Sequence, residues 1–272
     1  MSATSVRPVP RRLRWAVADG VTLTGRAVAH WRRQPGQFVV GLLFPVLMVL
    51  MFGYLFGGAM SVPGGGDYRE FLLPGMFAMT MLFGIESTYA AVATDAARGV
   101  TDRFRSLPMT SSAVLTGRAA ADLLHSAAGL AVMLACGVAV GWQWRSGAPG
   151  ALGAVGLLLL LRFALIWVGI HLALVLRRPE SVVMLQILVW PLGFTSNAFV
   201  SPDTMPGWLA AVAAWNPLSA TVAACRHLFG NPGAGSDTFP AQHAIALAVA
   251  WPLLLIAVFG PLAVRRYRRL GR

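Results

Sequence analysis

Six long runs of apolar residues divide the chain, and polar residues gather between them. A helix needs about 20 apolar residues to cross a bilayer, and each run has roughly that length. The pattern therefore predicts an all-α membrane protein with six transmembrane helices. The predicted spans are Phe38–Phe56, Phe71–Ala93, Ala113–Trp142, Leu152–Leu176, Val182–Val200 and Ala241–Val264.

The positive charges lie at the ends of these runs and indicate their orientation. All 22 basic residues are arginine. Eighteen fall on the side of the N-terminus, against three on the other side (Arg69, Arg145 and Arg226), and Arg162 alone lies deep within a span. Because cytoplasmic loops carry the excess of Arg and Lys, both termini are expected to be cytoplasmic. The expected organisation is a cytoplasmic N-terminus (1–36), a membrane domain (37–266) and a short cytoplasmic tail (267–272).

An amphipathic helix is predicted before the first span. Its apolar positions recur at spacings of three and four residues, and Pro35 and Gly36 end it. A helix of this kind lies in the cytoplasmic membrane interface with its apolar face toward lipid. The alternative is a packed helix of a small N-terminal domain, for which some 35 residues are too few. The apolar stripe consists of Val17, Val21, Thr24, Val28 and Trp31.

The loop between the second and third spans, residues 94–112, carries a short helix of its own in this interpretation. Gly99 ends the preceding helix, and Pro108 ends a short helix over Asp102–Leu107. This helix places Phe104 between Arg103 and Arg105, an arrangement suited to docking a partner protein. Composition alone gives equal support to a docking helix and to a plain loop whose charges only set the orientation in the membrane.

The segment between the fifth and sixth spans, residues 201–240, is too long for a turn and too apolar for an exposed loop. Two pieces of about a dozen residues are expected to be helical, one around Trp208–Trp215 and one over Leu218–Phe229. Both are too short to cross a bilayer. The prediction is a pair of re-entrant helices in the outer leaflet.

Composition excludes several classes of protein. Charged residues make up only 12% of the chain, about half the share in soluble domains. Without lysine the chain cannot form a conventional P-loop, so any ATP-driven motor must be another polypeptide. The net charge of +12 does not indicate nucleic-acid binding, because the arginines flank apolar runs. We predict no catalytic, cofactor-binding or metal-binding residues, and Cys136 and Cys225 form no disulfide framework.

Several short motifs resemble the permease subunits of type-2 ATP-binding-cassette (ABC) exporters, especially those of the daunorubicin-resistance kind from actinobacteria. The most specific motif is Arg103-Phe104-Arg105-Ser106-Leu107-Pro108, within the loop from Asp95 to Met109. The strings Asn216-Pro217-Leu218-Ser219 and Trp31-Arg32-Arg33-Gln34-Pro35 fit as well. The likeness in layout covers nearly the whole chain.

The resemblance implies a bacterial plasma-membrane permease that pairs with a second copy or a paralogue. Each permease docks an ATPase subunit, which binds the ATP and magnesium. By this likeness the loop after the second span is the coupling helix, and the docking residues are Arg103, Phe104, Arg105 and Leu107. The substrate path runs between the paired permeases and is lined by the first, second and fifth spans. Drugs, lipids and natural products all remain open as cargo.

Two charged residues lie deep within predicted spans, where a charge is costly and tends to be functional. Glu86 is about 22 Å and Arg162 about 15 Å from the outer surface, at about 1.5 Å per helical residue. The similar depths predict a Glu86–Arg162 pair, either as a buried structural bridge or as part of the transport path, with no pairing as the third possibility.

Flexible and aromatic side chains in the first two spans could form an adaptable surface for bulky amphipathic substrates. Ordinary helix packing explains the same residues equally well. Asn197, near the outer end of the fifth span, could touch a substrate or cap a helix. The candidate path residues are Phe44, Met48, Met51, Phe52, Met79, Phe83 and Asn197.

Two other classes of protein compete with an exporter subunit. An intramembrane enzyme would need clustered catalytic groups, but the five histidines share no face and no carboxylates pair within a span. A secondary transporter usually shows repeated halves and broken helices at the membrane midplane. No repeat is evident in the chain. An ATPase that co-purifies with the chain would separate these alternatives.

Overall fold

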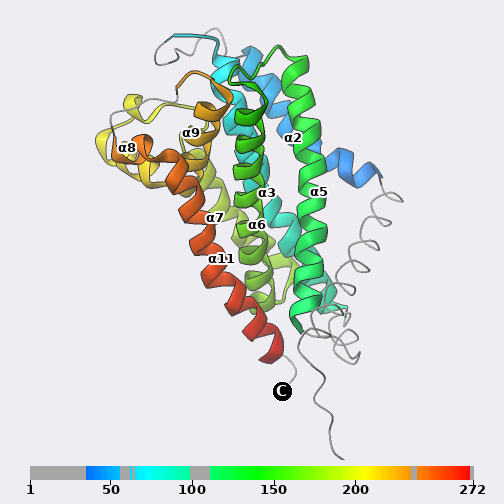
Figure 1. Cartoon of the computed structure of the whole chain (residues 1–272). Coiled ribbons are helices and arrows are strands. Elements are labelled where there is room, and N and C mark those ends of the chain that lie inside the picture. Colours follow the sequence, from blue (N-terminus) through cyan, green and yellow to red (C-terminus); the bar gives the residue numbers. More distant parts are fainter. Residues whose placement is uncertain (1–34, 56–61, 63–64, 99–110, 234–237, 270–272) are drawn as a thin grey trace, which may run out of the picture.

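The computed structural model describes residues 35–55, 62, 65–98, 111–233 and 238–269. Within these ranges every regular element is helical, which confirms the predicted all-α class. The long helices run side by side in one bundle, and the shorter α8, α9 and α10 gather near one of its ends (Figure 1). The predicted N-terminal amphipathic helix and the predicted coupling helix lie outside the described residues.

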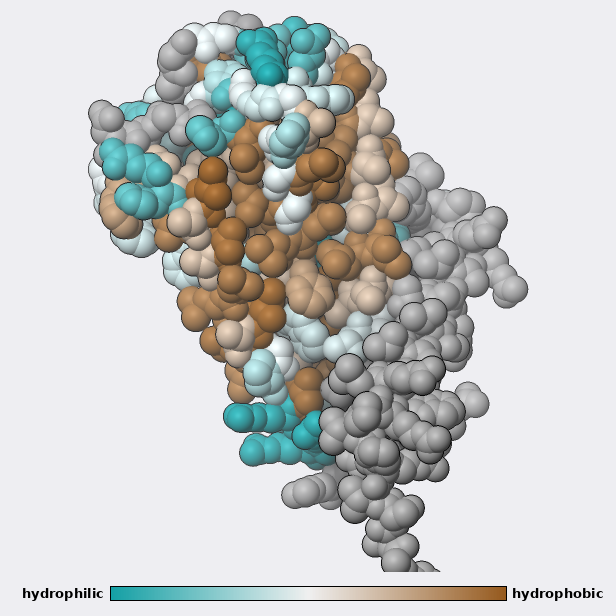
Figure 2. Space-filling model, in the orientation of Figure 1, coloured by the Kyte–Doolittle hydropathy of each residue, from teal (hydrophilic) through white to brown (hydrophobic). Residues whose placement is uncertain are grey.

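Four helices are long and apolar enough to cross a membrane: α3 (Tyr68–Ala97), α5 (Ser111–Ala139), α6 (Gly147–Leu176) and α11 (Ala244–Arg269). They coincide with the predicted second, third, fourth and sixth spans within a few residues. Apolar side chains cover the middle of the bundle, and hydrophilic residues gather at its two ends (Figure 2). This belt fits a protein embedded in a bilayer through its middle.

Helices at the predicted first and fifth spans are shorter. The first comprises α2 (Pro35–Leu50) and a π-helical turn, η1 (Met51–Leu55). The fifth comprises a 3₁₀ turn, η2 (Pro179–Ser181), and α7 (Val182–Phe194). The prediction that the fifth span continues to Val200 is wrong, because the chain leaves the helix after Phe194. The hydroxyls of Thr195 and Ser196 donate to carbonyls of the last turn, at Pro191 and Gly193, and end it.

Helix α3 lies at the centre of the bundle and contacts α2, α5, α6, α7 and α9. Two of its glycines allow unusually close approach. A Cβ at Gly75 would lie 2.5 Å from the carbonyl oxygen of Ala198, in the loop after α7. A Cβ at Gly84 would lie 2.8 Å from Cζ of Arg162 on α6. Small residues at such positions let a helix backbone approach a neighbouring backbone, as at Gly75, or a neighbouring side chain, as at Gly84.

The segment before α11 folds into η3 (Pro202–Thr204), α8 (Gly207–Trp215), α9 (Pro217–Phe229) and α10 (Phe239–Gln242). Helices α8 and α9 meet at an angle of 75°. Asn216 fixes this corner: its side chain accepts from the amide of Leu218 and donates to the carbonyl of Leu192. Gly230 ends α9 in the left-handed conformation. Most of α9 is buried against α3, α6 and α11, so this half-helix belongs to the core of the bundle.

Candidate functional site

The predicted docking residues Arg103, Phe104, Arg105 and Leu107 lie outside the described residues, but the helices on either side of them are described. Arg118 on α5 forms a 2.9 Å ion pair with Asp95 near the end of α3. Its Nε also lies 3.2 Å from Oδ1 of Asp122, one turn along α5. In this three-residue connection, Asp95–Arg118–Asp122, the Asp95–Arg118 pair joins the two helix ends that flank residues 99–110.

Arg162 is almost fully buried on α6, where it connects three helices. Its Nε donates to Oγ of Ser126 on α5, and its Nη2 donates to Oγ1 of Thr88 on α3, both at 2.7 Å. The hydroxyl of Ser126 donates in turn to the carbonyl of Asp122. Polar contacts therefore run from Asp95 and Arg118 into the interior of the bundle, as far as Arg162.

The predicted Glu86–Arg162 pair is wrong. Glu86 accepts a hydrogen bond from Nε2 of Gln186 on α7 at 2.9 Å, and Arg162 bonds the two hydroxyls instead. Residues 84 and 88 share the face of α3 that meets Arg162, whereas residue 86 lies about half a turn around the helix. Similar depth in the membrane did not place the two side chains on facing surfaces.

An aromatic strip of six side chains connects α2, α3 and α7. Phe44 and Phe83 both contact Trp190. Their ring centroids lie 5.6 Å and 5.2 Å, respectively, from the centroid of the Trp190 ring. Trp190 stacks on Phe194, which lies one turn along α7. The strip continues through Phe199 and ends at Phe52. Its six members are Phe44, Phe52, Phe83, Trp190, Phe194 and Phe199.

Part of the strip is open to the surroundings. Phe44, Trp190 and Phe194 expose 38%, 36% and 44% of their surface, so rings can still be approached from outside the chain. Neighbouring apolar residues of α2 and α7 are exposed as well, among them Leu47 and Ile187. The structure thus leaves an aromatic surface on the α2–α7 side of the bundle.

Only some of the predicted path residues belong to this surface. Phe44, Phe52 and Phe83 are members of the strip, and Met51 is exposed beside it on η1. Met48 is half-buried against the core. Met79 is fully buried and faces Gly193 of α7, so it is a core residue here. Asn197 lies elsewhere, in a pocket described below.

Sequence reasoning missed Trp190, Phe194 and Phe199 as members of the strip. The signal was present: Trp190 and Phe194 are four residues apart in the fifth apolar run, a spacing that puts them on one helical face. Phe199 could not have been assigned this way, because it joins the strip only through the loop that folds back after α7.

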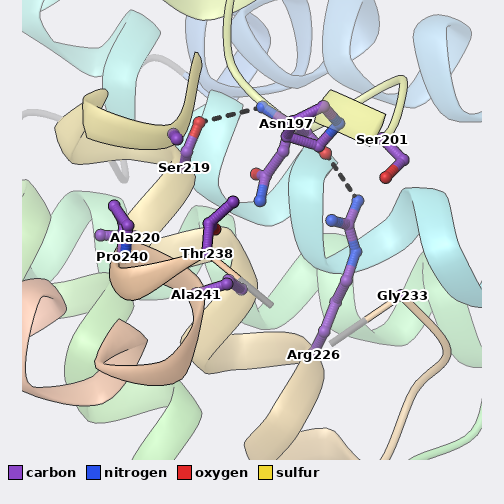
Figure 3. A pocket seen from close by; sticks show the side chains of 12 residues that line it. Asn197, Ser201, Ser219, Ala220, Arg226, Gly233, Thr238, Pro240 and Ala241 are labelled. Atoms are coloured by element: carbon purple, nitrogen blue, oxygen red, sulfur yellow. Dashed lines mark hydrogen bonds between the residues drawn. The ribbon is translucent and has the colours of Figure 1, made fainter. Parts of the chain in front are cut away.

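A second feature that the sequence did not reveal is the burial of Arg226 on α9, one of the three arginines that the charge pattern predicts on the external side. Its Nε donates to the carbonyl of Phe71, and its Nη2 donates to the carbonyls of Asn197 and Ala198. The guanidinium also lies 3.6 Å from the centroid of the Phe71 ring. Arg226 and Asn197 line a small pocket between α8, α9, α10 and the loop after α7 (Figure 3).

Comparisons with known proteins agree with this architecture. The ABC-2 type transporter family matches residues 20–229, which is most of the chain. This chain belongs to the ABC-2 type transporter family. The match includes α2 to α9, and with them the aromatic strip, Arg162 and Arg226. Helix α11 follows the matched region.

Some relatives of this chain are named as drug-resistance permeases. The daunorubicin resistance ABC transporter permease protein DrrB1 of Streptomyces coeruleorubidus is 34% identical over 93% of this chain and 87% of its own length. The doxorubicin resistance ABC transporter permease protein DrrB of Mycobacterium tuberculosis is 25% identical over 81% of this chain and 72% of its own. A putative transport permease, ycf38 of Cyanophora paradoxa, is 27% identical over 77% of this chain. The chain is therefore a membrane permease of the ABC-2 type.

Proposed function

We propose that this ABC-2 permease is the transmembrane subunit of an ATP-driven exporter for hydrophobic or amphipathic compounds that contain flat aromatic rings. The observation that carries the proposal is the aromatic strip. Stacked and edge-on aromatic contacts are worth about 0.5–1.5 kcal/mol per pair beyond their buried area, so a row of partly open rings favours a planar ligand. The drug-resistance names of the relatives point to the same class of cargo.

In this proposal the chain pairs with a second copy or a paralogue along α2 and α7. The exposed apolar residues of these helices, such as Leu43, Leu47, Val183 and Ile187, then face the partner or the substrate rather than lipid alone. The aromatic strips of the two permeases line a shared path. α2 and the η2–α7 segment complete the six spans, and α8 and α9 form the re-entrant pair on the external side.

The permease itself carries out no chemistry. A separate ATPase subunit holds ATP and magnesium and docks on Arg103, Phe104, Arg105 and Leu107. The arginine-rich C-terminal end of α11 lies at the same end of the bundle as the C-terminal end of α3 and the N-terminal end of α5, so we assign this end to the cytoplasm (Figure 1). Movement of the docked ATPase reaches the bundle through the Asp95–Arg118–Asp122 connection between α3 and α5.

The test is co-expression with an ATPase subunit from the same genome, followed by co-purification and efflux of daunorubicin from membrane vesicles. The wild-type pair is expected to co-purify and to export only with ATP. Phe104→Ala is expected to lose both, whereas Phe239→Ala, an exposed aromatic at the other end of the bundle, keeps both. Export driven by a proton gradient without any ATPase would identify a secondary transporter instead.

A further inference from the structure

The pocket beside Arg226 has both polar and apolar walls and lies apart from the aromatic strip. It has a volume of about 40 Å³, and no strip residue lines it. Arg226, Asn197, Ser201, Ser219 and Thr238 supply its polar groups, and small apolar residues such as Ala220 and Ala223 complete the wall. A water needs roughly 10–15 Å³ of such space, so the pocket has room for the polar end of a larger molecule.

Two groups in this pocket lack the partners that buried groups normally have. The guanidinium of Arg226, which is 1% exposed, bonds only neutral carbonyls, and no carboxylate lies within 4 Å of it in the described part of the chain. Buried charges are normally paired. Oδ1 of Asn197, a residue that is 8% exposed, has no hydrogen-bond partner among the described residues.

The backbone N–H and carbonyl of Asn197 already have hydrogen-bond partners, so the side chain is the part of this residue that can bind a ligand. Its amide N–H donates to Oγ of Ser219, and its carbonyl accepts from Arg226. The side-chain amide points into the pocket, between Ser219, Thr238 and the guanidinium of Arg226 (Figure 3). A ligand at this point would meet a cation together with an amide that can both donate and accept.

The elements around the pocket carry exposed aromatic residues. Trp208 and Trp215 on α8 expose 72% and 54% of their surface, and Phe239 on α10 stacks on Trp215 and exposes 59%. Tryptophan gathers at the level of lipid headgroups in membrane proteins. A soluble phosphate ester and a lipid headgroup share the chemistry that Arg226 and Asn197 recognise, and these aromatic neighbours favour the lipid.

We propose that this pocket binds the headgroup of an anionic phospholipid that carries hydroxyl groups, such as phosphatidylglycerol, in the outer leaflet. A phosphate oxygen accepts hydrogen bonds from Arg226 and from the amide of Asn197, and a headgroup hydroxyl donates to Oδ1 of Asn197. The bound anion balances the buried guanidinium. The outer-leaflet position rests on the proposed orientation, but lipid selectivity itself requires neither ATP nor an ATPase, so the two proposals fail in different experiments.

The experiment uses the purified full chain in detergent, with bound lipid counted by native mass spectrometry at matched concentrations of phosphatidylglycerol, phosphatidylcholine and soluble glycerol 3-phosphate. Wild type is expected to prefer phosphatidylglycerol over phosphatidylcholine by about tenfold, which corresponds to one hydrogen bond with a charged group. Equal binding of the two lipids would overturn the proposal. Equal binding of glycerol 3-phosphate and phosphatidylglycerol would overturn the assignment to a lipid.

Two variants address the pocket by different routes. Asn197→Asp keeps the size of the side chain but places a negative charge beside Arg226, and Ala223→Leu fills the space. Both are expected to reduce the preference to about twofold or less, whereas Gln143→Glu, an equivalent charge change at an exposed position, keeps it. Retention of the full preference by a monodisperse preparation of either variant would contradict the proposal. If one variant fails to fold, the other and the wild-type comparison still decide.

Discussion

The Nε of Arg162 and the Oγ of Ser126 lie 2.7 Å apart and join α6 to α5 in the interior of the bundle. Nη2 of the same guanidinium bonds Thr88 of α3 at 2.7 Å, so one buried cation holds three helices together with two neutral hydroxyls. Hydrogen bonds to charged groups contribute more than neutral ones. The stability of the bundle should therefore depend on these two hydroxyls.

Replacing Thr88 by Val keeps the shape of the side chain but removes the acceptor for Arg162. We expect a loss of about 1.5–3 kcal/mol, because a donor of a buried guanidinium is left without a partner. The measurement is the thermal unfolding temperature in detergent. Thr94→Val is the matched control, since the hydroxyl of Thr94 bonds only the carbonyl of Ala90 in its own helix. Equal shifts for the two variants would refute this role of Arg162.

Gly75→Ala should destabilise the fold severely. The added Cβ would lie 2.5 Å from the carbonyl oxygen of Ala198, and this neighbour is backbone that cannot rotate away. Overpacking of this kind costs about 1–3 kcal/mol or more. The control is Gly156→Ala in α6, where a Cβ meets nothing within 4 Å. That change should be neutral or should stabilise by about 0.5–1 kcal/mol through helix propensity. Thermal unfolding of both variants checks the contrast.

Asp95→Asn should impair transport more than stability. The Asp95–Arg118 pair is partly exposed, and pairs of this kind contribute about 0–1 kcal/mol. If the pair transmits movement between α3 and α5, its loss should lower daunorubicin efflux several-fold while ATP hydrolysis by the co-purified ATPase persists. Asp203→Asn, on η3, is the control and should leave both rates unchanged. Parallel losses of efflux and hydrolysis by Asp95→Asn would argue against transmission.

Trp190→Ala should weaken recognition of planar aromatic substrates. Trp190 contacts Phe44, Phe83 and Phe194, and loss of its ring contacts with a bound substrate should cost about 1–2 kcal/mol, or roughly tenfold in apparent affinity. Trp208→Ala removes an equally large but more exposed ring from α8 and serves as the control. The readout is the concentration dependence of daunorubicin efflux. A change of the same size in both variants would contradict a specific role of the strip.

The long helices could be predicted from the sequence because hydropathy alone determines them: α3, α5, α6 and α11 coincide with their predicted spans. The end of the fifth span was predictable only in part. The hydroxyl bonds of Thr195 and Ser196 to the last turn are local, so this Thr-Ser pair was a usable signal. The packing of the following loop on Gly75 is a tertiary contact that no local pattern reveals. The bend at Asn216 between two short helices was predictable, because Asn-Pro is a strong helix-start signal.

The candidate site was predictable only in part. Phe44, Phe52 and Phe83 could be selected by residue type, but the pair Glu86–Arg162 was inferred from depth, and depth does not determine which helix face a residue occupies. Arg226 was missed because arginine is normally counted as a surface charge. Its burial depends on three backbone carbonyls from distant parts of the chain, which only the folded structure brings together.

Helix α3 has a mechanical consequence for the whole molecule. The carbonyl of Phe71 near one end is bound by Arg226, and Asp95 near the other end is bound by Arg118, about 36 Å away along a single continuous helix. If α3 tilts at the Asp95 end, the Phe71 end must shift against the buried guanidinium of Arg226, and that contact would then be the point about which the helix turns.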